Sequence, residues 1–245
     1  MYTLVTSAIH LAGCERRPGY IPGFFVLRML FYMNNKKKIA IYVDGFNLYH
    51  GIKNLNKPYL KWLNLRSLAE KFIDPKVDHI EKIYYFSAIA THLDKETILR
   101  HRTYVEALET VGVDFIGGNF KKKMLDYKNK QISLQWTKHE EKETDVNISI
   151  HMVRDSIRRS FDKIILITND TDMVPAVKMA RSENNEIQFK LLTPPTLETH
   201  DSLLKAIKPG HATKLTEGHI KTSLLPDTIK KKNGKIVHIP APYKL

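Results

Sequence analysis

The chain has 245 residues, of which 42% are hydrophobic and 27% are charged. This composition is typical of a globular protein with one large domain or two small ones, and it excludes a disordered or fibrous chain. The single cysteine, Cys14, excludes an internal disulfide framework and a cysteine-rich zinc site. It also favours a reducing compartment, so we expect a cytoplasmic protein.

Positive charge is concentrated at the two ends of the chain. The formal net charge is +13, to which residues 1–38 contribute +5, residues 197–245 contribute +5 and the much longer middle only +3. A basic chain favours polyanionic partners, with nucleic acid first and an acidic membrane surface second. A basic protein without such a partner is the alternative that charge alone leaves open.

The N-terminal residues differ in character from the rest. Two arginines precede an apolar run over residues 20–33, which imitates a secretory signal but has no small-residue cleavage site after it. A proline and an arginine interrupt the run, so it is too short to cross a bilayer and we expect no membrane span. We treat residues 1–35 as an N-terminal extension and hypothesise that the native protein starts at Met33. A weak anchor to the membrane surface is the alternative.

From Ile39 onward, strand patterns alternate with helix patterns. Continuous apolar and β-branched runs are typical of strands that are buried on both faces of a parallel sheet. They predict strands at residues 38–44, 80–88, 113–116, 163–168 and 187–192. Helices are predicted at residues 64–73, 95–111, 144–159 and 173–182. Residues 120–125 and 131–137 flank a polar turn and predict a hairpin.

Local signals predict several helix ends and one buried helix face. Asn64 and Asp94 are suited to cap the first two helices, and Gly112 is suited to end the second. The helix at residues 144–159 is expected to turn an apolar stripe toward the core. The predicted stripe consists of Val146, Ile150, Val153 and Ile157.

This alternation predicts an α/β fold with a central, mostly parallel, five-stranded sheet and helices on both of its faces. We assign the domain to residues 36–196, because two consecutive prolines at positions 194 and 195 end the pattern. Residues 197–245 are interpreted as a basic C-terminal tail.

Carboxylates follow the predicted strands where α/β folds bind ligands, outside the carboxyl ends of parallel strands. Asp44 ends the first strand, Asp170 and Asp172 follow the fourth, and Asp145 opens the helix between them. Four carboxylates at one rim repel each other unless a cation neutralises them, and oxygen ligands suit Mg²⁺ or Mn²⁺. Each acid also has a purely structural explanation, as a turn residue or as a helix cap.

The segments that carry these acids resemble the NYN family of the PIN-like nuclease superfamily, and within it the bacterial LabA-like branch. The resemblance rests on three segments, Ile41-Tyr42-Val43-Asp44-Gly45-Phe46-Asn47-Leu48-Tyr49, Glu140-Glu141-Lys142-Glu143-Thr144-Asp145-Val146-Asn147 and Ile167-Thr168-Asn169-Asp170-Thr171-Asp172-Met173. The tail adds Ser223-Leu224-Leu225-Pro226-Asp227 and Ile239-Pro240. It implies a PIN-like α/β/α sandwich, a divalent-metal site and hydrolysis of phosphodiester bonds in RNA or another nucleic acid by a metal-activated water.

Carried over by position, the resemblance assigns roles to individual residues. The implied catalytic and metal-binding residues are Asp44, Asp145, Asp170 and Asp172, and the implied supporting residues are Asn47, Thr168, Asn169 and Thr171. Asn47 would orient Asp44 or bind substrate, and Thr168 would supply a supporting hydroxyl. Many PIN domains carry a further acid on a helix. Glu70 and Glu96 are candidates without a motif, which leaves the number of metal ions open.

Basic and aromatic side chains are candidates for contacts with a nucleic acid. The basic candidates are Lys121, Lys122, Lys123, Arg154, Lys230, Lys231 and Lys232. Tyr49, Tyr127 and Trp136 are candidates for stacking on bases. Runs of charge are commonly just solvated faces, and Tyr49 and Trp136 are equally suited to packing.

Two other classes of protein remain as alternatives. The segment Asp170-Thr171-Asp172-Met173-Val174 is similar to the nucleophile motif of haloacid-dehalogenase phosphatases, although only 73 residues follow Asp172 and they lack the later acidic pair. The second alternative is a binding or regulatory module that keeps the fold without useful turnover. The sequence also leaves self-association into a homo-oligomer open.

Overall fold

The computed structural model describes residues 36–128 and 133–244. The chain divides into two units, Met1–Lys36 and Lys37–Leu245, and the description below concerns the second. The predicted N-terminal extension, the start at Met33 and part of the predicted hairpin turn lie outside the described residues. Within those residues, no helix is both long enough and apolar enough to cross a membrane.

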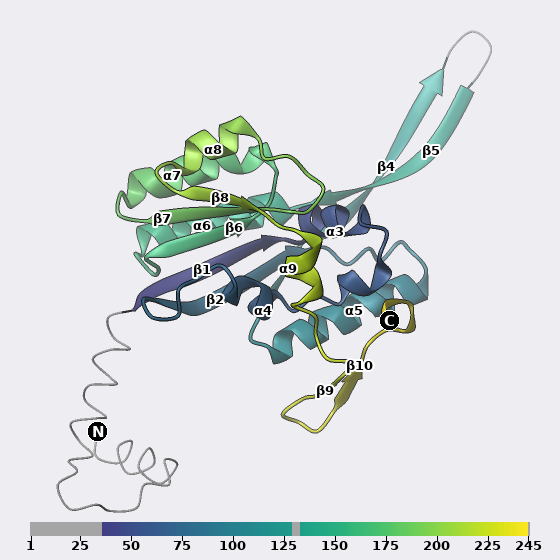
Figure 1. The fold of residues 1–245 in the computed structure, drawn as a ribbon. Coiled ribbons are helices and arrows are strands. Elements are labelled where there is room, and N and C mark those ends of the chain that lie inside the picture. Colours follow the sequence, from purple (N-terminus) through teal and green to yellow (C-terminus); the bar gives the residue numbers. More distant parts are fainter. Residues whose placement is uncertain (1–35, 129–132, 245) are drawn as a thin grey trace, which may run out of the picture. The chain divides into compact units, whose positions relative to one another are not determined.

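A six-stranded, all-parallel sheet forms the centre of this unit (Figure 1). Its strands, in spatial order, are β3 (Asp114–Gly117), β2 (Asp78–Ser87), β1 (Lys37–Asp44), β6 (Lys163–Ile167), β7 (Gln188–Thr193) and β8 (His211–Lys214). The predicted α/β fold class is confirmed. The sixth strand, β8, comes from the segment that the sequence predicts to be tail, and it extends the sheet at its edge next to β7.

The run of apolar residues in the central strand β1 is unbroken because both faces of this strand are buried. Residues 39–43 are all completely buried, because helices cover both faces of the sheet. Ile39, Ile41 and Val43 belong to the core on one face, while Ala40 and Tyr42 belong to the core on the other. A strand buried on both sides has no polar face to show, which removes the alternation seen in half-exposed strands.

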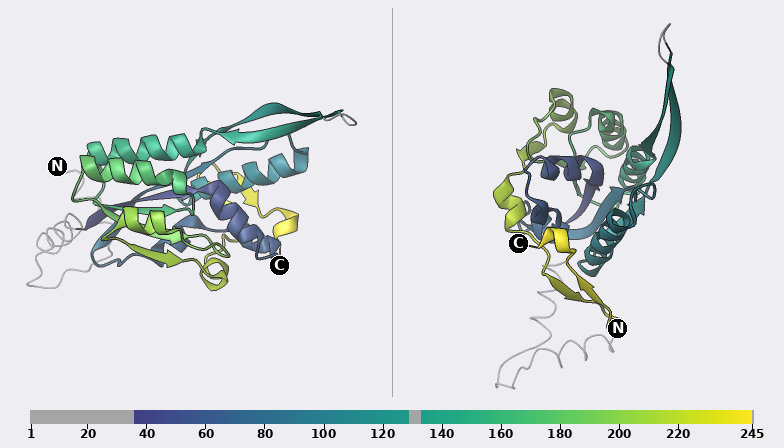
Figure 2. Two further views of the ribbon diagram at one scale, coloured as in Figure 1. Left: turned by 90° about the horizontal axis from the view of Figure 1, so that it is seen from above. Right: turned by 90° about the vertical axis from the view of Figure 1, so that its right-hand side faces the viewer.

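The helices are divided between the two faces of the sheet (Figure 2). On one face pack α3 (Gly45–Lys53), α4 (Leu65–Glu70), α5 (Lys95–Thr110) and α9 (Glu217–Lys221). On the other pack α6 (Thr144–Ile157), α7 (Val174–Glu183) and α8 (Asp201–Ile207). Short 3₁₀ turns are η1 (Pro58–Lys61), η2 (Thr171–Met173) and η3 (Ala241–Tyr243). The sequence does not predict α3, α8 or α9.

Both predicted N-caps are confirmed. The Asn64 side chain accepts hydrogen bonds from the backbone N–H groups of Arg66 and Ser67 at 3.1 Å, and Asp94 accepts one from Thr97 at 2.8 Å. Gly112 follows α5 with φ +76°, a conformation in which glycine avoids the strain of a side chain. Helix α4 ends at Glu70, three residues before the predicted end at Ile73.

The predicted hairpin is confirmed, with longer strands than the sequence indicates. Strand β4 (Asn119–Lys128) pairs antiparallel with β5 (Ser133–Lys142), and the two project away from the sheet (Figures 1 and 2). The base of the hairpin joins β3 to α6, so its first and last residues lie beside the carboxyl ends of the parallel strands.

The predicted core stripe of α6 is wrong. Ile150 is 58% exposed and Ile157 is 56% exposed, whereas Ile148, Met152 and Asp155 are buried. The reason is a buried polar interaction. The Tyr42 hydroxyl of β1 donates a 2.6 Å hydrogen bond to Asp155, which allows an aspartate to occupy the core stripe. The rule that a buried helix face carries no charged residue therefore predicts the wrong face of α6, the one with Val146, Ile150, Val153 and Ile157.

The C-terminal residues pack against the domain. A small hairpin of β9 (Thr228–Lys230) and β10 (Ile236–His238) contributes Val237 to the core. Lys231 forms ion pairs with Glu106 at 3.0 Å and with Glu109 at 3.6 Å on α5. The tail therefore covers part of the core, and Lys231 is engaged in holding it there.

The two isoleucines of α6 provide a test of its orientation. Ile148→Ala should lower the free energy of unfolding by about 2–5 kcal/mol, because it leaves a cavity beneath the sheet. Ile150→Ala should change it by about 0.5 kcal/mol or less, as is usual for an exposed position. Urea denaturation measures both values, and equal losses in the two variants would contradict the observed orientation.

Candidate functional site

Asp44 is the last residue of β1 and also the N-cap of α3. Its Oδ1 accepts a hydrogen bond from the backbone N–H of Asn47 at 2.9 Å, and its Oδ2 accepts one from the Thr168 hydroxyl at 2.8 Å. The Asp44-Gly45 pair is therefore not a surface turn. A Cβ at Gly45 would lie 2.7 Å from the carbonyl oxygen of Phe86, so only glycine lets α3 start this close to β2.

The end of β6 is tied to the end of β1. Asn47 accepts a hydrogen bond from the backbone N–H of Asn169 at 2.9 Å, and the Thr168 hydroxyl accepts one from the N–H of Asp170 at 3.0 Å. These contacts place Asn47 and Thr168 beside Asp44, where the resemblance put supporting residues. The Asn169 side-chain oxygen is buried and has no hydrogen-bond donor among the described residues.

Three of the four predicted acids line one cavity of about 190 Å³, which we call the acid cavity. Its lining residues are Asp44, Phe46, Asn47, His50, Glu141, Asp145, Asp170 and Leu197. Asp145 comes from the first turn of α6 and Asp170 from the loop after β6. The predicted convergence of carboxylates at this edge of the sheet thus holds for Asp44, Asp145 and Asp170.

Glu141 belongs to a segment that carries the family resemblance, but the sequence analysis assigns it no role. It lies near the end of β5, and its carboxylate accepts a hydrogen bond from the Thr144 hydroxyl at the start of α6. The two suggested candidates are elsewhere, since neither Glu70 nor Glu96 lines the cavity and the Glu96 side chain is 90% exposed. The feature of the sequence that could have identified Glu141 is its position four residues before Asp145, where a strand leads into a helix.

The acids of the cavity perturb one another. Burial and, to a smaller extent, the charges of Asp145 and Asp170 raise the pKa of Asp44 to about 6, although its two hydrogen bonds act in the opposite direction. Partial burial and the charges of Asp170, Glu141 and Asp172 raise the pKa of Asp145 to about 6 as well. A cation in the cavity would relieve this repulsion.

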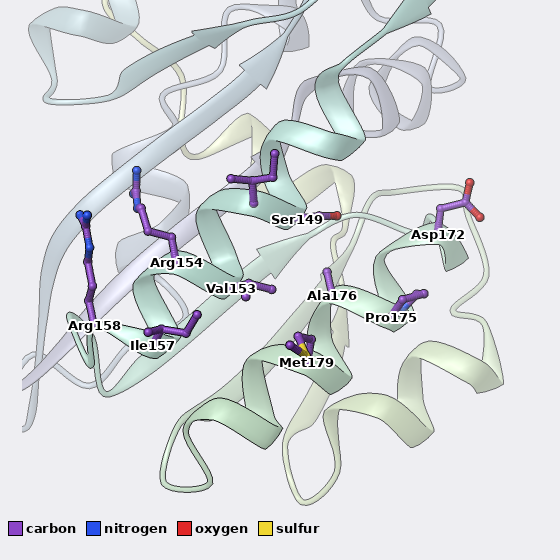
Figure 3. Close-up of a pocket in the computed structure, with 10 residues that line it drawn as sticks. Ser149, Val153, Arg154, Ile157, Arg158, Asp172, Pro175, Ala176 and Met179 are labelled. Atoms are coloured by element: carbon purple, nitrogen blue, oxygen red, sulfur yellow. The ribbon is translucent and has the colours of Figure 1, made fainter.

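Asp172, the fourth predicted acid, does not line the acid cavity. Its backbone N–H donates to Asp170 at 2.8 Å, but its exposed carboxylate lines a groove of about 630 Å³ between α6 and α7. Figure 3 shows Asp172 at one end of this groove and Arg158 at the other. The groove is otherwise mainly apolar because the exposed face of α6 forms one wall. Thr171, also exposed, lies beside Asp172 at the start of η2.

The donor set suits a hard divalent cation without being arranged as a complete coordination shell. Within the described residues, no group of three or more His, Cys, Asp or Glu side chains is positioned to hold a metal ion. Mg²⁺ does not need one, because it commonly keeps several waters and binds through one or two carboxylates and the phosphates of its substrate. The raised pKa values of Asp44 and Asp145 mean that their charged forms are disfavoured in the protein without a cation.

The predicted nucleic-acid contacts fall into two groups. Lys121, Lys122 and Lys123 are exposed on β4 near the cavity. Arg154 instead pairs with the buried Asp155 at 2.7 Å and lines the groove between α6 and α7. Lys230 and Lys232 are exposed at the tail hairpin, while Lys231 is held by α5. Tyr49 and Trp136 are both exposed, and the side chain of Tyr127 lies outside the described residues.

Fold and cavity together define a class: parallel α/β domains with a carboxylate cluster at the carboxyl end of the sheet. A family model described as "NYN domain" matches residues 38–208, and the chain belongs to this family. The match assigns the Asp170–Asp172 segment to an NYN domain rather than to a haloacid-dehalogenase phosphatase.

Two individual proteins are similar to the chain. The 6-hydroxy-3-succinoylpyridine 3-monooxygenase HspA of Pseudomonas putida is 29% identical over 205 residues, which is 71% of this chain and 65% of that protein. The chain thus spans just under two thirds of the length of this relative. The crystal structure of VPA0982, a protein of unknown function from Vibrio parahaemolyticus, matches with a TM-score of 0.50 at 16% identity and covers 78% of this chain and 98% of that one. At this identity the structural match supports the fold alone.

The buried charge of Asp44 predicts a stability change in the metal-free protein. Because the pKa of Asp44 in the folded state, about 6, lies above that of an unfolded aspartate, ionising it costs stability as the pH rises through this range. Asp44→Asn removes that cost. The melting temperature should therefore rise at neutral pH, by about 2–4 °C for each kcal/mol recovered.

Thermal unfolding in EDTA at several pH values measures this effect. The gain should disappear below a pH of about 4, where the carboxyl is protonated in both states. The exposed Asp227→Asn is the matched control and should show no such dependence. A lower melting temperature for Asp44→Asn at neutral pH would contradict the prediction.

Proposed function

We propose that this protein is a divalent-metal-dependent nuclease that hydrolyses phosphodiester bonds, with RNA as its substrate. Membership of the NYN family supports the class of activity. The observation that carries the proposal is the acid cavity, in which Asp44, Asp145, Asp170 and Glu141 surround a small space at the carboxyl end of the sheet. Clustered carboxylates that repel one another are typical of functional sites, where a bound cation offsets their repulsion.

Asp44 and Asp145 are the residues that we propose hold Mg²⁺ or Mn²⁺, with Asp170, Glu141 and the more distant Asp172 acting directly or through water. The chemistry that such an ion supplies is polarisation of a phosphodiester and a lowered pKa for a bound water, the nucleophile. No nucleophilic side chain is required.

The protein's own residues have distinct tasks in this proposal. Asp44 is held rigidly, because both of its oxygens accept hydrogen bonds from Asn47 and Thr168. Asp145 stands at the open side of the cavity and is half-buried, so it is able to adjust when ligands bind. The ring of His50 lines the cavity and is exposed, so it is positioned to contact substrate groups that enter from solvent.

Incubation with end-labelled single-stranded RNA and DNA, in Mg²⁺, Mn²⁺ or EDTA, tests the activity. RNA should be cleaved in either metal and not in EDTA. Asp145→Asn should slow cleavage by about 100-fold or more, beyond the 10–100-fold that loss of a merely supporting group causes. The control Glu96→Gln, at an exposed glutamate of α5, should cleave at the wild-type rate. Equal rates for wild type and Asp145→Asn would show that the acid cavity does not perform the cleavage.

Two other functions would give different experimental results. A binding or regulatory module would retain RNA without cleaving it in any metal. The similarity to HspA favours hydroxylation of a pyridine as a second candidate, and oxygen consumption with 6-hydroxy-3-succinoylpyridine and a reductant would reveal it. We favour the nuclease because the NYN family model matches residues 38–208, whereas HspA is 29% identical and the match covers 65% of its length.

A further inference from the structure

A series of aromatic rings leads from the acid cavity onto the hairpin. Phe46 of α3 lines the cavity, and its ring centre lies 5.8 Å from that of Phe120 on β4. Phe120 is followed by His92 at 4.7 Å, edge to face, and His92 stacks in parallel on His139 of β5 at 4.0 Å. We call these four rings, which come from separate parts of the chain, the ring path.

The ring path is accessible from solvent. His92 is exposed, and Phe46, Phe120 and His139 are half-buried, so each ring keeps part of its surface free. Neither hydrophobic core includes Phe46 or Phe120. The ring path therefore lies at the surface, between the cavity and the hairpin.

The hairpin has two chemically different faces, because side chains alternate along a strand. Phe120 and Lys122 lie on one face of β4, and the partner of Lys122 across the ladder is His139 of the ring path. On the opposite face, Glu140 forms ion pairs with Lys123, Lys138 and Lys142. The same opposite face carries Trp136, paired with Leu125. Only the first face combines the ring path with the acid cavity.

This combination suits an unpaired nucleic-acid strand. Free bases stack on aromatic rings irrespective of sequence, while cationic side chains bind the phosphates between them. Bases inside a duplex already stack on each other and present no free face. A chain of rings that ends at a carboxylate cavity would accept single strands and bring one phosphodiester to the acids.

We propose that Phe120 and His92, with Lys122 beside them, bind single-stranded nucleic acid and guide it into the acid cavity. The proposal rests on the proposed function for the identity of the ligand, but it concerns binding and is testable without cleavage.

Fluorescence anisotropy with a short fluorescein-labelled oligouridylate measures the dissociation constant of the full chain in EDTA, which prevents metal-dependent cleavage. Phe120→Ala and His92→Ala should each raise the dissociation constant by about 5- to 150-fold, the loss expected for one stacked base. Phe120→Trp should restore tight binding, because tryptophan also offers a stacking face. An RNA duplex should bind more weakly than the single strand to the wild-type protein.

Trp136→Ala is the matched control, since Trp136 is a 48%-exposed aromatic residue on the opposite face of the same hairpin. It should leave the dissociation constant unchanged, which separates stacking from a general disturbance of the hairpin. Unchanged binding in both Phe120→Ala and His92→Ala, equal losses in Phe120→Ala and Trp136→Ala, or no binding of any single strand would each overturn the proposal.

The binding and cleavage results are independent. Binding that requires Phe120, without cleavage in any metal, would support the ring path and contradict the nuclease. Cleavage that requires Asp145, with full binding in Phe120→Ala, would support the nuclease and contradict the ring path.

Discussion

Asp44 lies where the central strand ends and α3 begins, it lines the acid cavity, and the residue is only 3% exposed. A carboxylate so far from water must find its hydrogen bonds in the protein. It finds them in the backbone of α3 and in Thr168 at the end of β6, so the same two contacts join three elements. They do not fully compensate the lost hydration, and its pKa remains raised. The structure thus keeps a charged group in a place where a cation would stabilise it.

A second buried carboxylate determines how the cavity is completed. Asp155 accepts a hydrogen bond from Tyr42 on the central strand and pairs with Arg154, which sets the rotation of α6 on the sheet. With α6 in this rotation, Asp145 faces the acid cavity and Ile150 and Ile157 face solvent. The apolar wall of the groove between α6 and α7 is therefore a consequence of the polar contact beneath the helix.

The hairpin connects the sheet to the proposed substrate. Its base supplies Glu141 to the acid cavity and Phe120 to the ring path, so the chemistry and the approach to it are built from neighbouring residues of one ladder. On its opposite face, Glu140 forms ion pairs with Lys123, Lys138 and Lys142. The rings, rather than the balance of charge, distinguish the face that adjoins the acid cavity.

The sequence by itself determined the α/β class, five of the six strands, the caps at Asn64 and Asp94, and the acids Asp44, Asp145 and Asp170. These follow from signals within a few residues, such as apolar runs, cap residues and acids at strand ends. Only the tertiary structure decided which face of α6 is buried, that Asp172 faces the neighbouring groove, that β8 joins the sheet and that Glu141 enters the acid cavity. Each depends on a partner distant in sequence. Asp155 is acceptable in the core because Tyr42 and Arg154 both donate hydrogen bonds to it. The four rings become a path only when three separate segments fold to one edge of the sheet.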